Sequence, residues 1–260
     1  MIAEEEILSY YRVDRNGFVT REFLSEHISK ALSYIKDIKH SRIGRFVENN
    51  LHVTNFEKLV RLAIVLHDAG KAFYQNSSYL REKDGEKYLS FLGHEFISAI
   101  IADHFAKEKI MEEYDFTYTA IVFAIFYHHH AMNVHSRQKT IKNLSSLDVR
   151  TFSRFKNRLK DTLTSFLTGE DARIVGKCVD NLNESFSPAD LRSIEKEIDE
   201  RLIVRGRPED IILKKLSFIV LNCLITCDYL SARGRGDYES DFYRAITNFY
   251  ESWLGQSQSA

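Results

Sequence analysis

The sequence predicts a mainly α-helical fold that opens with a short β-hairpin. Apolar residues recur at spacings of three and four over most of the chain, which is the period of helices with one buried face. The chain of 260 residues contains only two prolines and 11 glycines, so little interrupts long helices. Near the start, aromatic and β-branched residues lie on both sides of an Asn16-Gly17 pair, which favours a hairpin turn.

The helical pattern starts after the hairpin, where Leu24, His27 and Ile28 fall on one buried stripe. Asn55 is expected to cap the following helix, which runs to an HDAGK segment in which Gly70 suits a helix end. Residues 73–91 are polar and are expected to form a loop. Further helices are predicted at 93–109, 116–131, 150–167, 171–186, 188–205, 208–232 and 241–254.

Composition predicts a single cytoplasmic domain spanning residues 1–260. Hydrophobic residues make up 44% and charged residues 28%, as in globular proteins, and no repeat or linker divides the chain. Three cysteines without a CxxC pair fit a reducing compartment. No signal peptide is visible, and the most apolar stretch is too short to span a membrane, so we expect no membrane partner. The net charge of −1 means that any nucleic-acid binding must be local.

Histidine and aspartate residues recur on or at the ends of the apolar helices. Imidazole and carboxylate together suit divalent cations such as Mn, Ni, Co or Mg, and Asp68 is the natural bridge between two of them. Asp228 stands in an apolar run, where a carboxylate is costly unless it is paired or bound to metal. The set comprises His27, His67, Asp68, His94, the run His128 to His130, and Asp228.

The order of these residues resembles the HD phosphohydrolase superfamily, whose signature is an adjacent His and Asp. The resemblance is closest to the CRISPR-associated HD nuclease of type I interference. The matching segments are LSEHI after the hairpin, HDAGK, LGHE, paired histidines after IFY, and TCDYLSA. With no GxxxxGK[ST] loop and no room for helicase lobes, the chain resembles the stand-alone form of that nuclease, which works beside a separate helicase.

The resemblance implies an HD-domain helical fold and a metal-dependent nuclease for single-stranded DNA or RNA, with the CRISPR surveillance complex as a partner. It implies that Lys71 contacts the scissile phosphate while the cations activate water for attack on phosphorus. A third consecutive histidine leaves the choice within the run open, although the spacing from Ile125 favours the first two. The implied ligands are His27, His67, Asp68 and Asp228 for one cation, and Asp68, His94, His128 and His129 for the other.

A local excess of basic residues could guide a nucleic-acid backbone. Eight basic residues and one acidic residue lie between positions 137 and 160. Arg154, Lys156 and Arg158 are predicted to bind the backbone, with Phe152 or Phe155 available for base stacking. Arg233, just past Asp228, is predicted to do the same near the metals. A solvated helix face is the structural alternative.

Two other functions remain open at this point. An HD-type nucleotide phosphohydrolase would share the His and Asp ligands but would need a closed pocket for one base and ribose. A non-catalytic HD module that senses a ligand would be expected to have lost ligands, whereas every expected ligand is present here. Hydrolysis of a labelled single strand or of a nucleotide would separate these functions.

Overall fold

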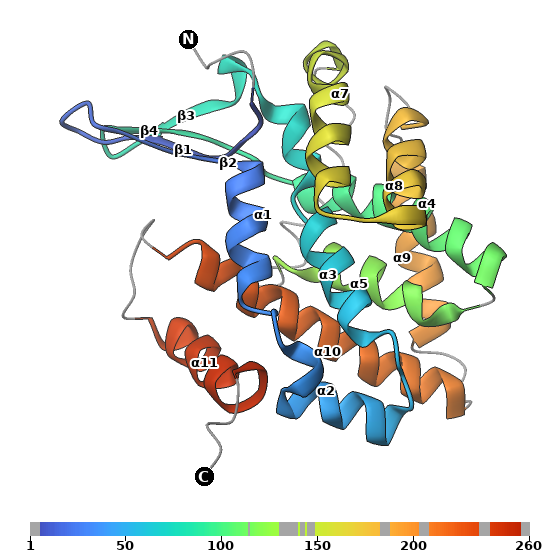
Figure 1. Ribbon diagram of the computed structural model, residues 1–260. Helices are drawn as coiled ribbons and strands as arrows, with labels where there is room; N and C mark the ends of the chain where they lie inside the picture. The colour runs from blue at the N-terminus through green and yellow to red at the C-terminus, as the bar shows by residue number, and fades with distance from the viewer. Residues whose placement is uncertain are drawn as a thin grey trace.

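The computed structural model describes residues 6–113, 115–129, 140, 144, 149–182, 188–202, 208–233 and 240–255. Within these ranges the chain is mainly α-helical and carries one small antiparallel sheet, which confirms the predicted fold class. Figure 1 shows the sheet extending to one side of the packed helices. In the same ranges, no helix combines the length and the apolar character needed to cross a membrane.

The predicted helices are present, although several of their ends differ. Shorter turns of 3-10 or π-helix join them, and α2, capped by the Ser41 hydroxyl, was not predicted. The helices are α1 (Leu24–Ser33), α2 (Arg42–Phe46), α3 (Phe56–Leu66), α4 (His94–Glu113), α5 (Thr119–Tyr127), α7 (Val149–Ser165), α8 (Gly169–Asp180), α9 (Pro188–Leu202), α10 (Pro208–Ser231) and α11 (Asp241–Phe249).

Four antiparallel strands form the sheet, in the order β2-β1-β4-β3. They are β1 (Leu8–Val13), β2 (Val19–Phe23), β3 (Leu80–Lys83) and β4 (Glu86–Leu89). The β1–β2 pair is the predicted hairpin, and its register shifts between Leu8 and Tyr10. This irregularity lies at the end of β1 that enters the helical body, so it changes the direction of the chain there.

The predicted loop at 73–91 is wrong, because this segment holds the β3–β4 hairpin. Asp84 and Gly85 form its turn, and both have positive φ angles, of 53° and 77°. Two consecutive left-handed residues make the tight turn that joins antiparallel strands, and Asp-Gly is a favoured pair for it. The turn signal was therefore present in the sequence among charged residues.

The core is centred on α3 and α5. Eight of the eleven residues of α3 and eight of the nine of α5 are buried. A helix that is apolar on all sides is stable only when other elements surround it, and α4 and α10 pack against α5. Side chains at the ends of α3 and α5 are consequently held by a closely packed interior.

Asn55 precedes α3 as predicted, but its side chain does not cap the helix. The side-chain amide instead donates hydrogen bonds to Asp115 Oδ2 at 2.8 Å and to Thr117 Oγ1 at 3.1 Å. The predicted cap is wrong because the Asn55 side chain binds Asp115 and Thr117, which are distant in sequence, instead of the helix backbone. Asn55 thereby ties the start of α3 to the turn before α5.

Gly70 is not a helix end, because α3 already ends at Leu66. Its role is to let α4 approach the turn after α3. The Gly70 N–H donates to Ser98 Oγ at 2.9 Å, and a Cβ atom at this position would clash with the His94 carbonyl oxygen. Any side chain here would therefore push away the start of α4.

We expect Gly70→Ala to lower the free energy of unfolding by about 1–3 kcal/mol, the usual cost of overpacking. The added methyl group must displace the α4 backbone at His94, so this histidine should also move away from Asp68. Chemical denaturation measures the first effect and metal titration the second. Gly176→Ala in α8 is the matched control, because its Cβ would meet nothing closer than 3.4 Å. An unchanged stability of Gly70→Ala would contradict the close approach.

Candidate metal centre

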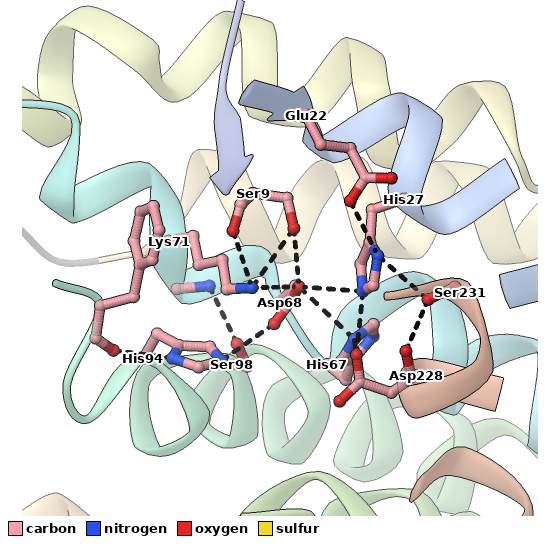
Figure 2. Close-up of polar contacts among 12 residues, drawn as sticks. Ser9, Glu22, His27, His67, Asp68, Lys71, His94, Ser98, Asp228 and Ser231 are labelled. Atoms are coloured by element: carbon pink, nitrogen blue, oxygen red, sulfur yellow. Dashed lines mark hydrogen bonds and ion pairs between the residues drawn. The ribbon is translucent and has the colours of Figure 1, made fainter. Parts of the chain in front are cut away.

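Five helices bring the predicted His and Asp side chains to one place, as Figure 2 shows for five of these side chains. One lies in α1, two follow the end of α3, one begins α4, two follow α5 and one lies near the end of α10. Most are fully buried, and the Asp228 side chain keeps 16% of its surface exposed. The seven residues are His27, His67, Asp68, His94, His128, His129 and Asp228.

The first group surrounds Asp228 and one oxygen of Asp68. His27 Nε2 lies 3.0 Å from Asp228 Oδ1 and 3.5 Å from Asp68 Oδ2. His67 Nε2 lies 3.5 Å from Asp68 Oδ2 and 3.7 Å from Asp228 Oδ1. Two imidazole nitrogens and two carboxylates therefore face one small volume.

The second group surrounds the other oxygen of Asp68. His94 Nε2 lies 2.9 Å from Asp68 Oδ1 and 3.3 Å from His129 Nε2. The ring of His128 packs against His129, with centroids 4.2 Å apart. Candidate ligand atoms of His94, His128 and His129 all lie within 4.8 Å of one another. Asp68 thus presents one oxygen to each group, which is the geometry required of a bridge.

Backbone carbonyls fix the tautomer of three of these histidines. Each Nδ1 lies 2.7 Å from the carbonyl oxygen three residues earlier, and a nitrogen that bonds to a carbonyl must carry the hydrogen. Nε2 then keeps its lone pair and faces the centre of the cluster, as in metal-binding histidines. The pairs are His67 with Ile64, His94 with Phe91 and His128 with Ile125.

His27 is oriented by side chains instead. The Ser231 hydroxyl donates to the Asp228 carbonyl at 2.7 Å, so its oxygen can accept from His27 Nδ1, which lies 3.1 Å away. Glu22 Oε2, from β2, lies 3.4 Å from the same nitrogen. Both contacts place the hydrogen on Nδ1, so Nε2, which lies 3.0 Å from Asp228 Oδ1, is the nitrogen that would bind a cation.

We expect Glu22→Ala to weaken metal binding at the first group, which contains His27, by about 10- to 100-fold, the usual effect of losing such a supporting contact. The Glu22 carboxylate also accepts from Lys30 Nζ at 2.5 Å, so Lys30→Met is the matched control that leaves the His27 contact intact. Isothermal titration with Mn measures both variants. Equal losses in the two variants would show that the ion pair, rather than the contact with His27, supports the site.

Lys71 is anchored next to the bridging carboxylate. Its Nζ donates to Asp68 Oδ2 at 2.6 Å and lies 3.2 Å from the Ser9 carbonyl oxygen. Ser9 Oγ is itself 3.4 Å from Asp68 Oδ2. The lysine therefore belongs to the cluster and places a positive charge beside it.

Burial keeps the histidines of the second group uncharged near neutral pH. It lowers the pKa of His94 to about 4, although the hydrogen bond to Asp68 opposes this shift. Burial likewise lowers the pKa of His128 and of His129 to about 3, with help from neighbouring histidines. Neutral imidazoles are the form that binds cations.

The two carboxylates remain ionised. Burial alone would raise the pKa of Asp68, but His67, Lys71 and His94 hold it well below its usual range. The pKa of Asp228 is also held low, against burial, by the hydrogen bond with His27 and by the neighbouring His67. The second group thus combines neutral nitrogen ligands with a negative oxygen ligand.

These residues fit a divalent cation. His67 Nε2 and His128 Nε2 are buried and have no hydrogen-bond partner among the described atoms. An unsatisfied buried nitrogen costs about 1–3 kcal/mol, a cost that a bound cation would remove. Nitrogen and oxygen ligands without thiolates suit Mn, Co, Ni or Mg.

Three of the predicted nucleic-acid contacts lie on α7, and Arg233 lies just past α10, five residues after Asp228. Arg154, Arg158 and Arg233 are exposed, whereas Lys156 Nζ donates to the Asp180 carbonyl at 2.7 Å. Their role in binding stays a prediction. His130 and several of the eight basic residues, at positions 137, 139 and 142, lie outside the described residues.

Base stacking on Phe152 or Phe155 is wrong as a prediction. Both rings are buried on the apolar stripe of α7. Phe152 stacks on Phe73 with centroids 3.9 Å apart and an interplanar angle of 4°. Phe152 thus packs α7 against the turn that carries Lys71, and neither buried ring has a face to offer a base.

Sequence reasoning missed the residues that support the ligands, namely Ser9, Glu22 and Ser231. No motif marks a serine or glutamate whose partner is distant in the chain. Glu22 had one visible signal, as a carboxylate directly before the helix of His27. Its contact could be recognised only once β2 was placed over α1.

Comparison with known proteins agrees with this geometry. Residues 23–162, more than half of the chain, match the HD domain family. The match contains six of the seven clustered residues, and α10 adds Asp228 from beyond it. No curated protein and no solved structure is detectably similar to the chain. The chain belongs to the HD domain family, and this membership indicates a metal-dependent phosphohydrolase.

Proposed function

We propose that the protein is a nuclease that uses two divalent cations to cleave phosphodiester bonds in single-stranded DNA or RNA. The observation that carries this proposal is the shared carboxylate. Asp68 lies 2.9 Å from His94 through Oδ1 and 3.5 Å from His27 through Oδ2, so the two ligand groups meet at this residue. Paired cation sites joined by a carboxylate are typical of enzymes that hydrolyse phosphodiesters.

The chain's own residues have separable tasks in this function. Bound cations would supply an activated water and neutralise charge on the phosphate oxygens. Lys71 would bind a phosphate oxygen, because its ammonium group already stands at the cluster beside Asp68. The carbonyl contacts at Nδ1 keep the imidazoles oriented and cost no reorganisation during the reaction.

The biological setting that we propose is type I CRISPR interference, beside a separate helicase and the surveillance complex. This step rests on the order of the HD segments in the sequence and on Asp228, which α10 brings to the cluster. Arg154, Lys156, Arg158 and Arg233 are proposed as flanking contacts to the phosphate backbone. The complete ligand set argues against a non-catalytic module.

Substrate hydrolysis with and without chelator tests the proposal. We expect the protein loaded with Mn, Co, Ni or Mg to cleave a labelled single strand, and excess chelator to abolish this cleavage because the ligands are nitrogen and oxygen atoms only. Nucleoside mono-, di- and triphosphates should remain intact under the same conditions. Cleavage that persists in chelator contradicts the metal mechanism. Nucleotide hydrolysis without strand cleavage would favour a nucleotide phosphohydrolase.

A further inference from the structure

One face of the four-stranded sheet carries basic and aromatic side chains outward from the metal centre. Residues paired across antiparallel strands point to the same face, as do alternate residues along a strand. The register pairs Tyr10 with Glu22, Arg12 with both Thr20 and Tyr88, Tyr88 with Arg81, and Glu86 with Lys83. We call the surface formed by these eight residues the Tyr88 face.

Exposure and charge on the Tyr88 face suit a polyanion. Arg81, Lys83 and Tyr88 are exposed, and neither basic residue forms an ion pair within the described part of the chain. Arg12 binds Glu86 at 2.6 Å across the sheet, which holds both side chains on this face. The outer part of the face therefore offers an aromatic ring beside two exposed basic residues. Arg81 also donates to the Ser78 and Leu80 carbonyl oxygens, and Lys83 lies opposite Glu86 in the register.

The same face leads directly to the metal centre. Glu22, the partner of Tyr10 in the sheet register, lies 3.4 Å from His27 Nδ1. Ser9, which precedes Tyr10, has its hydroxyl 3.4 Å from Asp68 Oδ2. Figure 2 shows Ser9 and Glu22 above the ligands, and Figure 1 shows the strands running outward from this point. A ligand on the Tyr88 face would lie next to the cluster at one end.

We propose that the Tyr88 face binds single-stranded nucleic acid and directs it to the metal centre. Bases stack on Tyr88, phosphates lie near Arg81 and Lys83, and the strand passes Tyr10 before it reaches Lys71. Proteins that bind single strands combine aromatic platforms with basic tracks in this way. The inference rests on the proposed nuclease function, to which it adds the path of the substrate.

The test compares two matched triple variants of the metal-loaded protein. Arg81→Thr, Lys83→Thr and Tyr88→Thr alter the Tyr88 face, whereas Arg21→Thr, Lys87→Thr and Tyr11→Thr remove the same kinds of group from the opposite face of the same sheet. We expect the first variant to raise KM for a labelled single strand by about tenfold or more, with kcat unchanged. The negative slope of log(kcat/KM) against log(salt) should become shallower by about 1.4 in this variant, because two phosphate contacts are lost.

Controls separate binding from folding and from chemistry. Hydrolysis of bis(p-nitrophenyl) phosphate, which is too small to reach the sheet, should be unchanged in both triple variants. Tyr88→Phe keeps the ring and should retain the wild-type KM. An unchanged KM in the first variant, or an equal increase in the second, overturns the inference and leaves the nuclease function standing. A wild-type protein that hydrolyses the small diester but no single strand overturns the nuclease function itself.

Discussion

Asp68→Ala is expected to abolish nuclease activity and to lower the occupancy of both cations. The reason is geometric, because Oδ1 faces His94 and Oδ2 faces His27 and His67, so one substitution removes a ligand from each group. The rate should fall by about 10³-fold or more, the scale on which a single charge-stabilising group acts. Elemental analysis of the purified variant measures the metal content alongside the rate.

Two further variants make this result specific. His94→Ala should empty mainly the second group, since its Nε2 faces Asp68 Oδ1 and His129. Asp103→Ala removes a buried carboxylate of α4 that pairs with Lys107 at 2.7 Å, so it should leave activity and metal content unchanged. Retention of both cations in Asp68→Ala would contradict the bridge.

The residues that cluster could be selected from the sequence because their signal is chemical and local. His67 and His128 end apolar helices, and a polar ring in such a position needs a partner. Asp228 could be selected for the same reason, because a carboxylate within an apolar run also needs a partner. Residue type and order were sufficient to select these positions before any fold was known.

The sheet could not be fully predicted because its pairing is not local. Six of the ten residues at positions 80–89 are charged, so the alternation of apolar and polar residues that marks a half-buried strand is absent. The β3–β4 hairpin exists because β4 pairs with β1, more than 70 residues earlier. Glu22 and Ser9 were missed with it, since their contacts depend on where that sheet lies.

Phe152 and Phe155 illustrate a different limit. In an isolated sequence, an aromatic residue among basic residues is compatible with a base platform and with the apolar stripe of an amphipathic helix. The helical period of α7 decides between them, because it puts both rings on the face opposite the exposed Arg154 and Arg158. The ring of Phe152 also stacks on Phe73, so this face of the ring is not available to a base.

The isolated protein is expected to cleave single strands faster than a closed duplex of the same sequence. Asp68 and His67 are almost completely buried, so a phosphate must bend inward to reach the ligands. A single strand bends easily, whereas duplex DNA is stiff over about 150 base pairs. A duplex closed by hairpins at both ends, compared with its separated strands at equal metal and salt, measures the preference without fraying ends.

Under the proposed function, a partner helicase with ATP should remove this preference, because it would present separated strands to the metal centre. Asp228→Ala should abolish cleavage of both substrates, with or without the helicase. The substitution removes the Asp228 carboxylate from the first group, and this loss does not depend on how the substrate strand is supplied. If the isolated protein cut the closed duplex as fast as the single strands, the cluster would have to be reachable by a rigid double helix. Under the proposed function, the burial of Asp68 and His67 favours a flexible strand, opened beforehand, as the substrate that reaches these side chains.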